Sequence, residues 1–187
     1  MDILFLLMKI CIALTFFATI WAIIIYNRFV LLKRQKDEAW SGILVQLQLR
    51  HDLVPQLVDV VKAYTAHERQ ILEDVITLRS FSLKSSLPLI QEKEHDLGHA
   101  LGRLFAVVEQ YPVLKSSQNY QDLFAALVKI EDDIQYARRY YNGTVRNYNI
   151  LVDSFPSIFI ARIFDYQESL FFELESPEFA QQPGVNY

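Results

Sequence analysis

Two histidines one helical turn apart are the side chains best suited by type and spacing to hold a metal ion. Glu92 and His95 have the Glu-x-x-His spacing of half a di-iron carboxylate centre, and Asp96 and His99 form a similar pair on the same segment. Such a centre needs a second Glu-x-x-His on another helix, and the sequence offers none. Both histidines also fall outside the apolar stripe of their segment. We therefore expect them on the solvent side of a helix, with no metal bound.

No other motif in the sequence predicts catalysis or cofactor binding. His67-Glu68 lacks the second histidine of a zinc protease, and no G-x-S-x-G, phosphate loop or dinucleotide fingerprint occurs. The run from Arg138 to Tyr141 could contact a phosphate or a lipid headgroup, but it fits better the solvated face beside a tyrosine-rich core. We therefore predict no catalytic, cofactor-binding or metal-binding residue, no small-molecule substrate and no enzyme activity.

His67 and Glu94 are polar residues at positions where the surrounding helical pattern is apolar. Buried groups of this kind need partners. Two interpretations stay open: a hydrogen-bonded core histidine with a glutamate that reaches the edge of the bundle, or a polar layer that fixes register or oligomeric state. Gly98 and Gly102 form a small-x-x-x-small pair, which we expect to permit one close approach between helices.

Four segments carry apolar residues at helical spacings of three and four: residues 27–51, 53–78, 87–108 and 123–152. Nothing in the chain resembles a strand. Short connections favour antiparallel neighbours. The predicted fold is all-α, with an N-terminal transmembrane helix followed by an antiparallel four-helix bundle of long helices. Its parts are a transmembrane helix over 1–26, the bundle over 27–155, and an apolar segment with an acidic aromatic tail over 156–187.

The segment 51–55 is predicted to break or sharply kink the first long helix. Asp52 is a good capping residue, and Pro55 disfavours the helical conformation at the residue before it. A full turn there would send the second bundle helix back toward the membrane. It would bring Phe81–Leu87 and the segment after Val152 to the bilayer surface.

The first 26 residues predict a membrane span. From Ile3 to Tyr26 the chain is apolar except for Lys9 and two threonines. A bilayer core needs about 20 such residues, and they must be helical there. No small-residue cleavage site of a signal peptide follows. Four basic residues lie just after the span, so the positive-inside rule places the C-terminal part in the cytoplasm, with Lys9 favouring the reverse.

The charge distribution excludes a nucleic-acid partner. The formal net charge is −4, and after Arg162 the chain has five acidic residues and no basic one, which leaves about +1 for everything before. No basic field suited to nucleic acid results. The only cysteine, Cys11, lies in the predicted span, so a disulfide scaffold is excluded.

The last 33 residues carry apolar groups whose place is open. Residues 155–164 contain one charge, Arg162, and either lie in the membrane interface or close the end of the bundle. Phe171, Phe172 and Phe179 stand among glutamates. Exposed aromatic side chains of this kind usually dock somewhere. We expect them on a neighbouring subunit, with the parent bundle as the alternative.

A series of ordered motifs resembles the LemA family and covers the span and nearly all that follows. The matching residues are Tyr26-Asn27-Arg28, Glu38-Ala39-Trp40, Val45-Gln46-Leu47, Arg50-His51-Asp52-Leu53-Val54-Pro55-Gln56-Leu57-Val58, Tyr64-x-x-His67-Glu68-Arg69, Tyr111-Pro112-x-Leu114-Lys115, Gln118-Asn119, Glu131, Ala137-Arg138-x-Tyr140-Tyr141-Asn142, Val145-Arg146-x-Tyr148-Asn149 and Ser154-Phe155-Pro156-Ser157. One departure is Asp132-Asp133, where family members tend to have Asn-Arg.

The resemblance implies a single-pass protein of the bacterial inner membrane with a cytoplasmic four-helix bundle and no agreed enzymatic activity. Relatives in magnetosome formation suggest membrane organisation, and frequent neighbourhood with a membrane zinc protease suggests a proteolysis adaptor. The expected partners are the lipid bilayer, a second copy of the chain, and a membrane protease or other membrane protein. We expect a membrane-anchored scaffold or adaptor acting through protein contacts. The alternative is a membrane-remodelling module acting directly on lipid.

Overall fold

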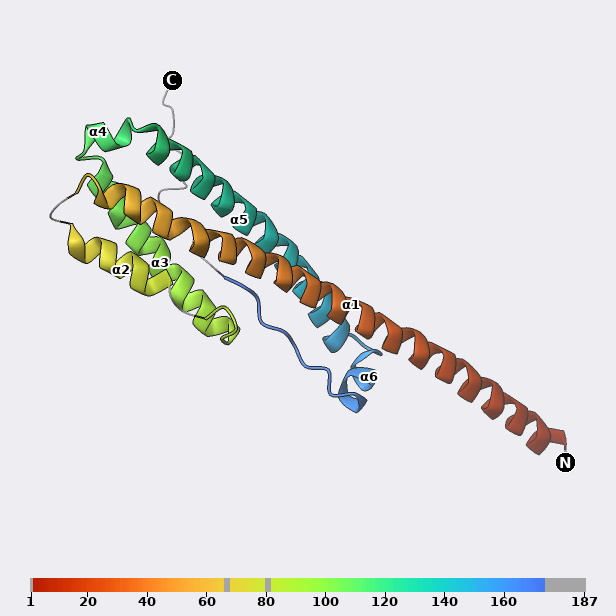
Figure 1. The fold of residues 1–187 in the computed structure, drawn as a ribbon. Helices are drawn as coiled ribbons and strands as arrows, with labels where there is room; N and C mark the ends of the chain where they lie inside the picture. The colour runs from red at the N-terminus through yellow and green to blue at the C-terminus, as the bar shows by residue number, and fades with distance from the viewer. Residues whose placement is uncertain (1, 66–67, 80–81, 174–187) are drawn as a thin grey trace, which may run out of the picture. The chain divides into compact units, whose positions relative to one another are not determined.

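The computed structural model describes residues 2–65, 68–79 and 82–173, and every regular element in them is an α-helix. The elements are α1 (Asp2–Lys62), α2 (Arg69–Arg79), α3 (Leu87–Val108), α4 (Pro112–Lys115), α5 (Gln118–Asp153) and α6 (Ile158–Ile163) (Figure 1). The predicted all-α class is therefore confirmed for the described residues. The chain forms two compact units: unit 1 combines Met1–Ala39 with Asn142–Leu170, and unit 2 combines Trp40–Tyr141 with Phe171–Tyr187.

The N-terminal part of α1 meets the length and apolar composition of a transmembrane helix, as predicted. Its two hydroxyl side chains are satisfied inside the helix, because Thr15 donates to the carbonyl of Cys11 and Thr19 to that of Thr15, each at 2.8 Å. This pairing suits a segment that has no water for its polar groups.

α1 continues as a helix through Pro55, so a break or full turn at residues 51–55 is wrong and the continuing helix, the other alternative, holds. A sharp kink there stays a prediction. A proline inside a helix costs about 3 kcal/mol, because it lacks a backbone donor and crowds the preceding turn. Its neighbours Val54 and Leu57 are completely buried in the core of unit 2, and burying such side chains is worth about 1.5–3 kcal/mol each. Packing therefore outweighs the cost of the proline. Phe81, which the turn would place at the bilayer, lies outside the described residues.

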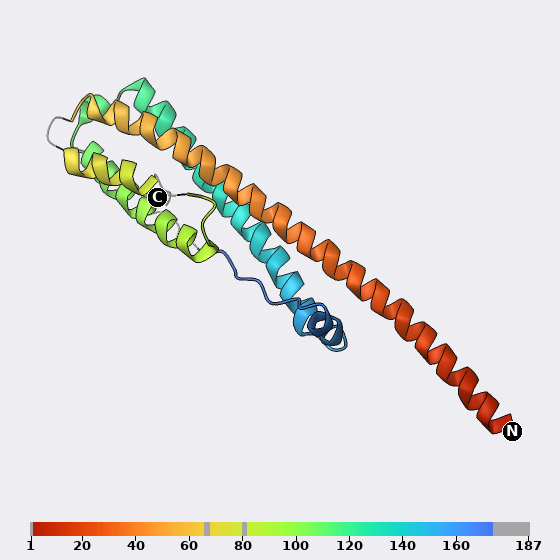
Figure 2. The same ribbon diagram turned by 60° about the horizontal axis from the view of Figure 1, so that its bottom comes forward.

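The core of unit 2 draws on five helices, α1 to α5. Its fully buried members include Leu57 and Val61 of α1, Val75 of α2, Leu97, Leu101 and Leu104 of α3, Leu114 of α4 and Leu127 of α5. α2 and α3 lie side by side (Figure 2). These helices share one core because each presents an apolar stripe at helical spacing. The complete antiparallel four-helix bundle over residues 27–155 stays a prediction.

The core of unit 1 is smaller and largely aromatic. Phe29 of α1 is fully buried between Tyr148 of α5, at 6.3 Å between ring centroids, and Tyr166, at 4.6 Å and nearly parallel. Ile160 and Ala161 of α6 are buried in the same cluster. Part of the apolar segment therefore closes this core. Phe159 and Ile163 do not close it, since both are exposed.

The segment from Asp165 to Glu173 is extended and docks on its own chain. In unit 1, the amide of Asn149 pairs with both backbone groups of Ser169, at 2.9 and 3.0 Å, and Lys36 Nζ donates to Ser169 Oγ at 2.8 Å. In unit 2, Phe172 is 0 % exposed, with its ring 5.4 Å from that of Trp40.

Docking of Phe172 on a neighbouring subunit is therefore wrong. The ring of Trp40 also lies 5.5 Å from that of Tyr141, so α1 and α5 offer Phe172 an aromatic site in the same chain. Aromatic pairs at these distances add to the gain from burial. Phe179, the third phenylalanine of the tail, lies outside the described residues.

Phe172→Ala is expected to lower the free energy of unfolding by about 3–5 kcal/mol, because it leaves a cavity where a completely buried ring stood. Phe171→Ala is the matched control: its ring is 40 % exposed, and the loss should stay below about 1 kcal/mol. Denaturant titration of the full chain in detergent, followed by circular dichroism, measures both. Equal losses for the two variants would contradict the docking of Phe172 in its own chain.

Candidate functional site

His95 and His99 are both exposed on α3, so their predicted surface position is confirmed. Their Nε2 atoms lie 3.1 Å apart, and the rings meet edge to face. Within the described residues, no group of three or more His, Cys, Asp or Glu side chains is arranged to hold a metal ion. The pair is therefore a local contact on the helix surface. His67 lies outside the described residues.

Glu94 is a charged residue that the structure buries inside unit 2. Its Oε2 lies 2.9 Å from Nη1 of Arg50, and its Oε1 lies 2.7 Å from Nε2 of His51. On the other side, Nε of Arg50 lies 2.8 Å from Oε1 of Glu131. We call these four residues the charge layer. It joins α1, which holds Arg50 and His51, to Glu94 on α3 and Glu131 on α5.

The charge layer is enclosed. Arg50 and Glu131 are 2 % exposed, Glu94 is 1 % and His51 is 4 %. Each helix places buried aliphatic residues three or four positions before and after its charged member: Leu47 and Val54 for Arg50, Ile90 and Leu97 for Glu94, Leu127 and Ile134 for Glu131. The layer is thus a polar level between two levels of buried aliphatic side chains. It contradicts the interpretation that Glu94 reaches the bundle edge; that the layer fixes register or oligomeric state stays a prediction.

The contacts of Arg50 are unequal. Nη1 donates a well-formed hydrogen bond to Glu94. The Nε–Glu131 contact has ion-pair distance but no hydrogen-bond alignment, and Nη2 has no hydrogen-bond partner among the described residues. Burying charge is costly unless it is paired. The guanidinium therefore depends on both carboxylates to remain inside the core.

Protons complete the charge balance of the layer. One guanidinium faces two carboxylates, so a proton on Glu131 balances the charge of these three groups. Burial raises the pKa of Glu131 above its ordinary value of 4.5; Arg50 opposes this shift, whereas Glu94 and Asp132 add to it. Burial, the largest cause, favours the uncharged form of a carboxyl group. The surroundings of Glu131 therefore favour its protonated, uncharged form.

The layer is suited to specify structure and not to turn over a substrate. Its residues are at most 4 % exposed, which leaves no surface on which a substrate could lie against them. What the layer can do is fix register. Sliding any of the three helices by one turn would remove a charge from its partner and place it against aliphatic side chains, which is strongly unfavourable.

The helical pattern found one of the four residues, Glu94; the other three, Arg50, His51 and Glu131, stand among the motifs that resemble the LemA family. In the segment 123–152 the helical spacing of apolar residues includes Ile130 and not Glu131, whereas the structure buries Glu131 and leaves Ile130 half-buried. Arg50 lies four residues before Val54 and three after Leu47, a spacing that marks the same face of α1. The predicted break at residues 51–55 hid that signal.

Two further expectations on surface motifs are tested by the structure. A side chain added at Gly102 would meet nothing within 4 Å, so the predicted close helix approach is wrong at this position.

In the run from Arg138 to Tyr141, Arg139 and Tyr140 are exposed and Tyr141 is buried. The guanidinium of Arg139 lies 4.5 Å from the ring of Tyr136. This agrees with a solvated face beside a tyrosine-rich core.

Comparison with known proteins adds a family and relatives. A model of the LemA family matches residues 39–187, a range that contains the whole charge layer. The chain is 27 % identical to "Magnetosome protein MamQ 2" and to "Magnetosome protein MamQ 1" of Paramagnetospirillum magneticum (strain ATCC 700264 / AMB-1). It is 25 % identical to "Magnetosome protein MamQ" of Magnetospirillum gryphiswaldense. Each match covers 79 % of this chain and 64 % of the relative, so the chain spans slightly less than two thirds of the length of these curated relatives.

Glu94→Ala is expected to lower the free energy of unfolding by about 3–5 kcal/mol, because it leaves Arg50 buried with one carboxylate removed. Glu92→Ala, two residues earlier on α3, removes an exposed carboxylate and should change stability by less than about 0.5 kcal/mol. Denaturant titration of both variants at pH 7 makes the comparison. A loss in the Glu94 variant no larger than in the Glu92 variant would show that the layer does not hold the helices.

The pKa of Glu131 predicts a pH dependence. Because this pKa is raised in the folded state, the stabilising contribution is fully present below the pKa of the unfolded carboxyl and is lost as pH rises through the folded pKa. Wild type should therefore gain stability relative to Glu131→Gln when the pH is lowered from 7 to 5. The gain is at most about 1.4 kcal/mol per pH unit. Unfolding titrations at both pH values measure it.

The control is Asp132→Asn, which removes the adjacent exposed carboxylate. Its difference from wild type should vary much less between pH 7 and pH 5. If wild type instead loses stability relative to Glu131→Gln on acidification, the pKa of Glu131 is lowered in the folded state and Arg50 outweighs burial.

Proposed function

The chain belongs to the LemA family, and from this membership and its apolar N-terminal helix we propose that it is a membrane-anchored helical scaffold or adaptor acting through protein–protein contacts. The observation that carries the proposal is α1, a single helix of 61 residues. Its first part has the composition of a membrane span, and its last part supplies buried residues to the core of unit 2. One element thus serves both as anchor and as part of the folded domain.

The charge layer supports a role as a fixed framework. Three helices joined at one buried level have a single favourable register, so the surfaces they display keep a constant arrangement. On this proposal the chain is a single-pass protein of the bacterial inner membrane with an antiparallel four-helix bundle in the cytoplasm. The orientation follows from the four basic residues after the span. The partners are a second copy of the chain and a membrane protease or other membrane protein.

The names of the relatives point in the same direction. They are magnetosome proteins, which suggests that this chain too works in organising a membrane. The alternative function, direct remodelling of lipid, is favoured by one observation: large apolar side chains of and around α6, among them Phe155 and Phe159, are exposed.

Photocrosslinking in cells and vesicle reconstitution test the two functions against each other. A photoreactive amino acid at Tyr136 or Tyr140, which are 66 % and 60 % exposed on α5, should form discrete links to a second copy or to another membrane protein. The same photoreactive amino acid placed at Leu14, in the apolar run of α1, is the control for random collisions in the membrane. Purified full chain added to vesicles at rising protein-to-lipid ratio should leave their diameter unchanged. Narrowed or tubulated vesicles together with no discrete links would replace the scaffold by the remodelling function.

A further inference from the structure

α6 is a short helix with one buried and one exposed side, and its only charged side chain is the exposed Arg162. Ile160 and Ala161 face the core of unit 1. Ser157 ties the start of the helix to the end of α5, because its hydroxyl lies 2.7 Å from the carbonyl of Leu151 and 2.9 Å from that of Ser154. The helix is thus held in place by its own chain, independently of what covers its outer side.

The outer side consists of four large apolar residues, which we call the α6 apolar face. They are Phe155, Phe159, Ile163 and Phe164, and Ile163 is 72 % exposed. The rings of Phe155 and Phe159 lie 5.9 Å apart. From residue 155 to residue 164 the only charged side chain is Arg162. Exposed large apolar side chains gathered on one short segment are unfavourable in water and mark a contact site.

The depth of this face is fixed by its contact with α1. The ring of Phe164 lies 4.8 Å from that of Tyr26, and both line a small apolar pocket with Thr19, Ala22 and Ile23. All four α1 residues belong to the last turns of the apolar run that ends at Tyr26. A bilayer that covers those turns must therefore meet Phe164 at the same depth. A protein partner at this face would have to enter the bilayer boundary, so lipid is the occupant that the contact selects.

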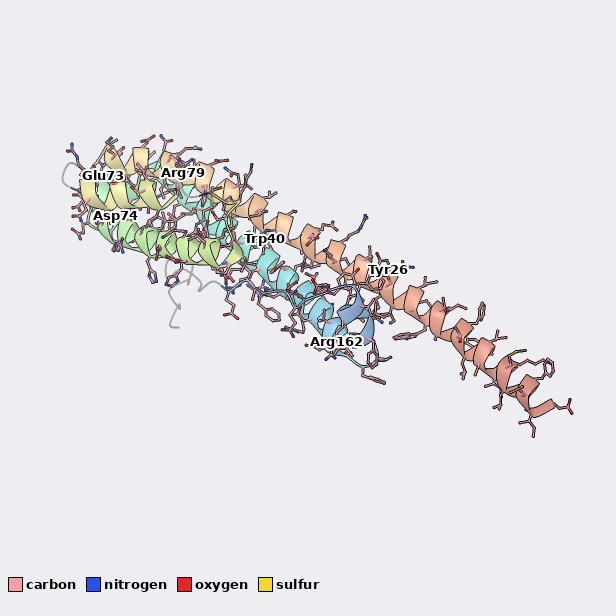
Figure 3. All side chains as sticks on the ribbon, turned by 90° about the horizontal axis from the view of Figure 1, so that it is seen from below. Tyr26, Trp40, Glu73, Asp74, Arg79 and Arg162 are labelled. Atoms are coloured by element: carbon pink, nitrogen blue, oxygen red, sulfur yellow. The ribbon has the colours of Figure 1, made fainter. Side chains whose placement is uncertain are left out.

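The charges beside the face suit the same depth. Arg162 on α6 and Arg28 on α1, two residues after the span, are both exposed. Figure 3 shows Arg162 on α6 alongside the part of α1 that carries Tyr26. Basic side chains at the end of a span meet lipid headgroups, and a short apolar helix with a cationic residue suits the interface and not the hydrocarbon centre.

We propose that the α6 apolar face inserts into the membrane interface beside the C-terminal end of the α1 span, so that unit 1 contacts the bilayer at two places. This rests on the proposed membrane anchoring by α1. The consequence is orientational. A single span leaves the chain free to rotate about the membrane normal and to tilt, whereas a second contact on one side of α1 restricts the tilt of unit 1.

Depth-dependent quenching on the full chain tests the proposal. In a Cys11→Ala background, single cysteines at Phe159 and Ile163 carry a fluorescent label in phosphatidylcholine–phosphatidylglycerol vesicles. The vesicles contain lipid with a nitroxide near the headgroup end of the acyl chain. Both labels should be quenched at least about twofold more than a label at Gln35. Gln35 is exposed on α1 and lies nine residues past Tyr26, about 14 Å along the helix axis.

A label at Leu14, near the middle of the span, is read in vesicles whose nitroxide lies near the terminal methyl of the acyl chain, and it separates the two proposals. Strong quenching at Leu14 with labels at Phe159 and Ile163 no more quenched than at Gln35 would overturn the α6 proposal and leave the anchor standing. Absence of quenching at Leu14 would overturn both. If neither soluble iodide nor the lipid nitroxide quenches the labels at Phe159 and Ile163, protein covers the α6 apolar face. That result would also overturn the α6 proposal. Because both labelled residues are exposed, circular dichroism should show unchanged helicity.

Discussion

The guanidinium of Arg50 is the interaction on which the order of unit 2 depends. It lies on α1 and contacts Glu94 of α3 at 2.9 Å and Glu131 of α5 at 2.8 Å, so one side chain links three helices that are far apart in the sequence. Apolar stripes alone allow helices to slide and rotate against one another, because aliphatic side chains pack in several similar ways. A buried charge with fixed partners allows only one register. The charge layer therefore converts a general tendency to associate into a single arrangement.

Such a layer is not explained by stability. A buried ion pair is often no more stabilising than aliphatic residues of the same size, and breaking one is costly. The guanidinium here also keeps one nitrogen, Nη2, without a hydrogen-bond partner among the described residues. The gain is in specificity. Pro55 follows His51 by one helical turn, and the buried Val54 and Leu57 beside it offset the cost of the proline.

Unit 1 is organised by aromatic rings and by one extended segment. Phe29, Tyr148 and Tyr166 form its centre, and the amide of Asn149 binds the backbone of Ser169 as an adjacent strand would. The same unit contains the end of the apolar run and the helix α6. Paired aromatic rings at these distances add to the gain from burial. Charge thus organises the core of unit 2, whereas aromatic rings organise the core of unit 1.

The periodicity of the sequence by itself determined the helical class, the apolar span and the extent of α3, which runs over residues 87–108 as predicted. It also placed His95 and His99 on the surface. These features follow from local spacing, because the positions of apolar residues decide which side of a helix is buried. Only the tertiary structure decided that α1 continues through Pro55, that Glu94 pairs with Arg50 and His51, and that Phe172 docks on its own chain. The physical reason is the same in each case. Pro55, Glu94 and Phe172 are each stabilised by contacts with residues that are distant in the sequence. Arg50 and Glu94, for example, are 44 positions apart. A local sequence pattern does not contain such partners.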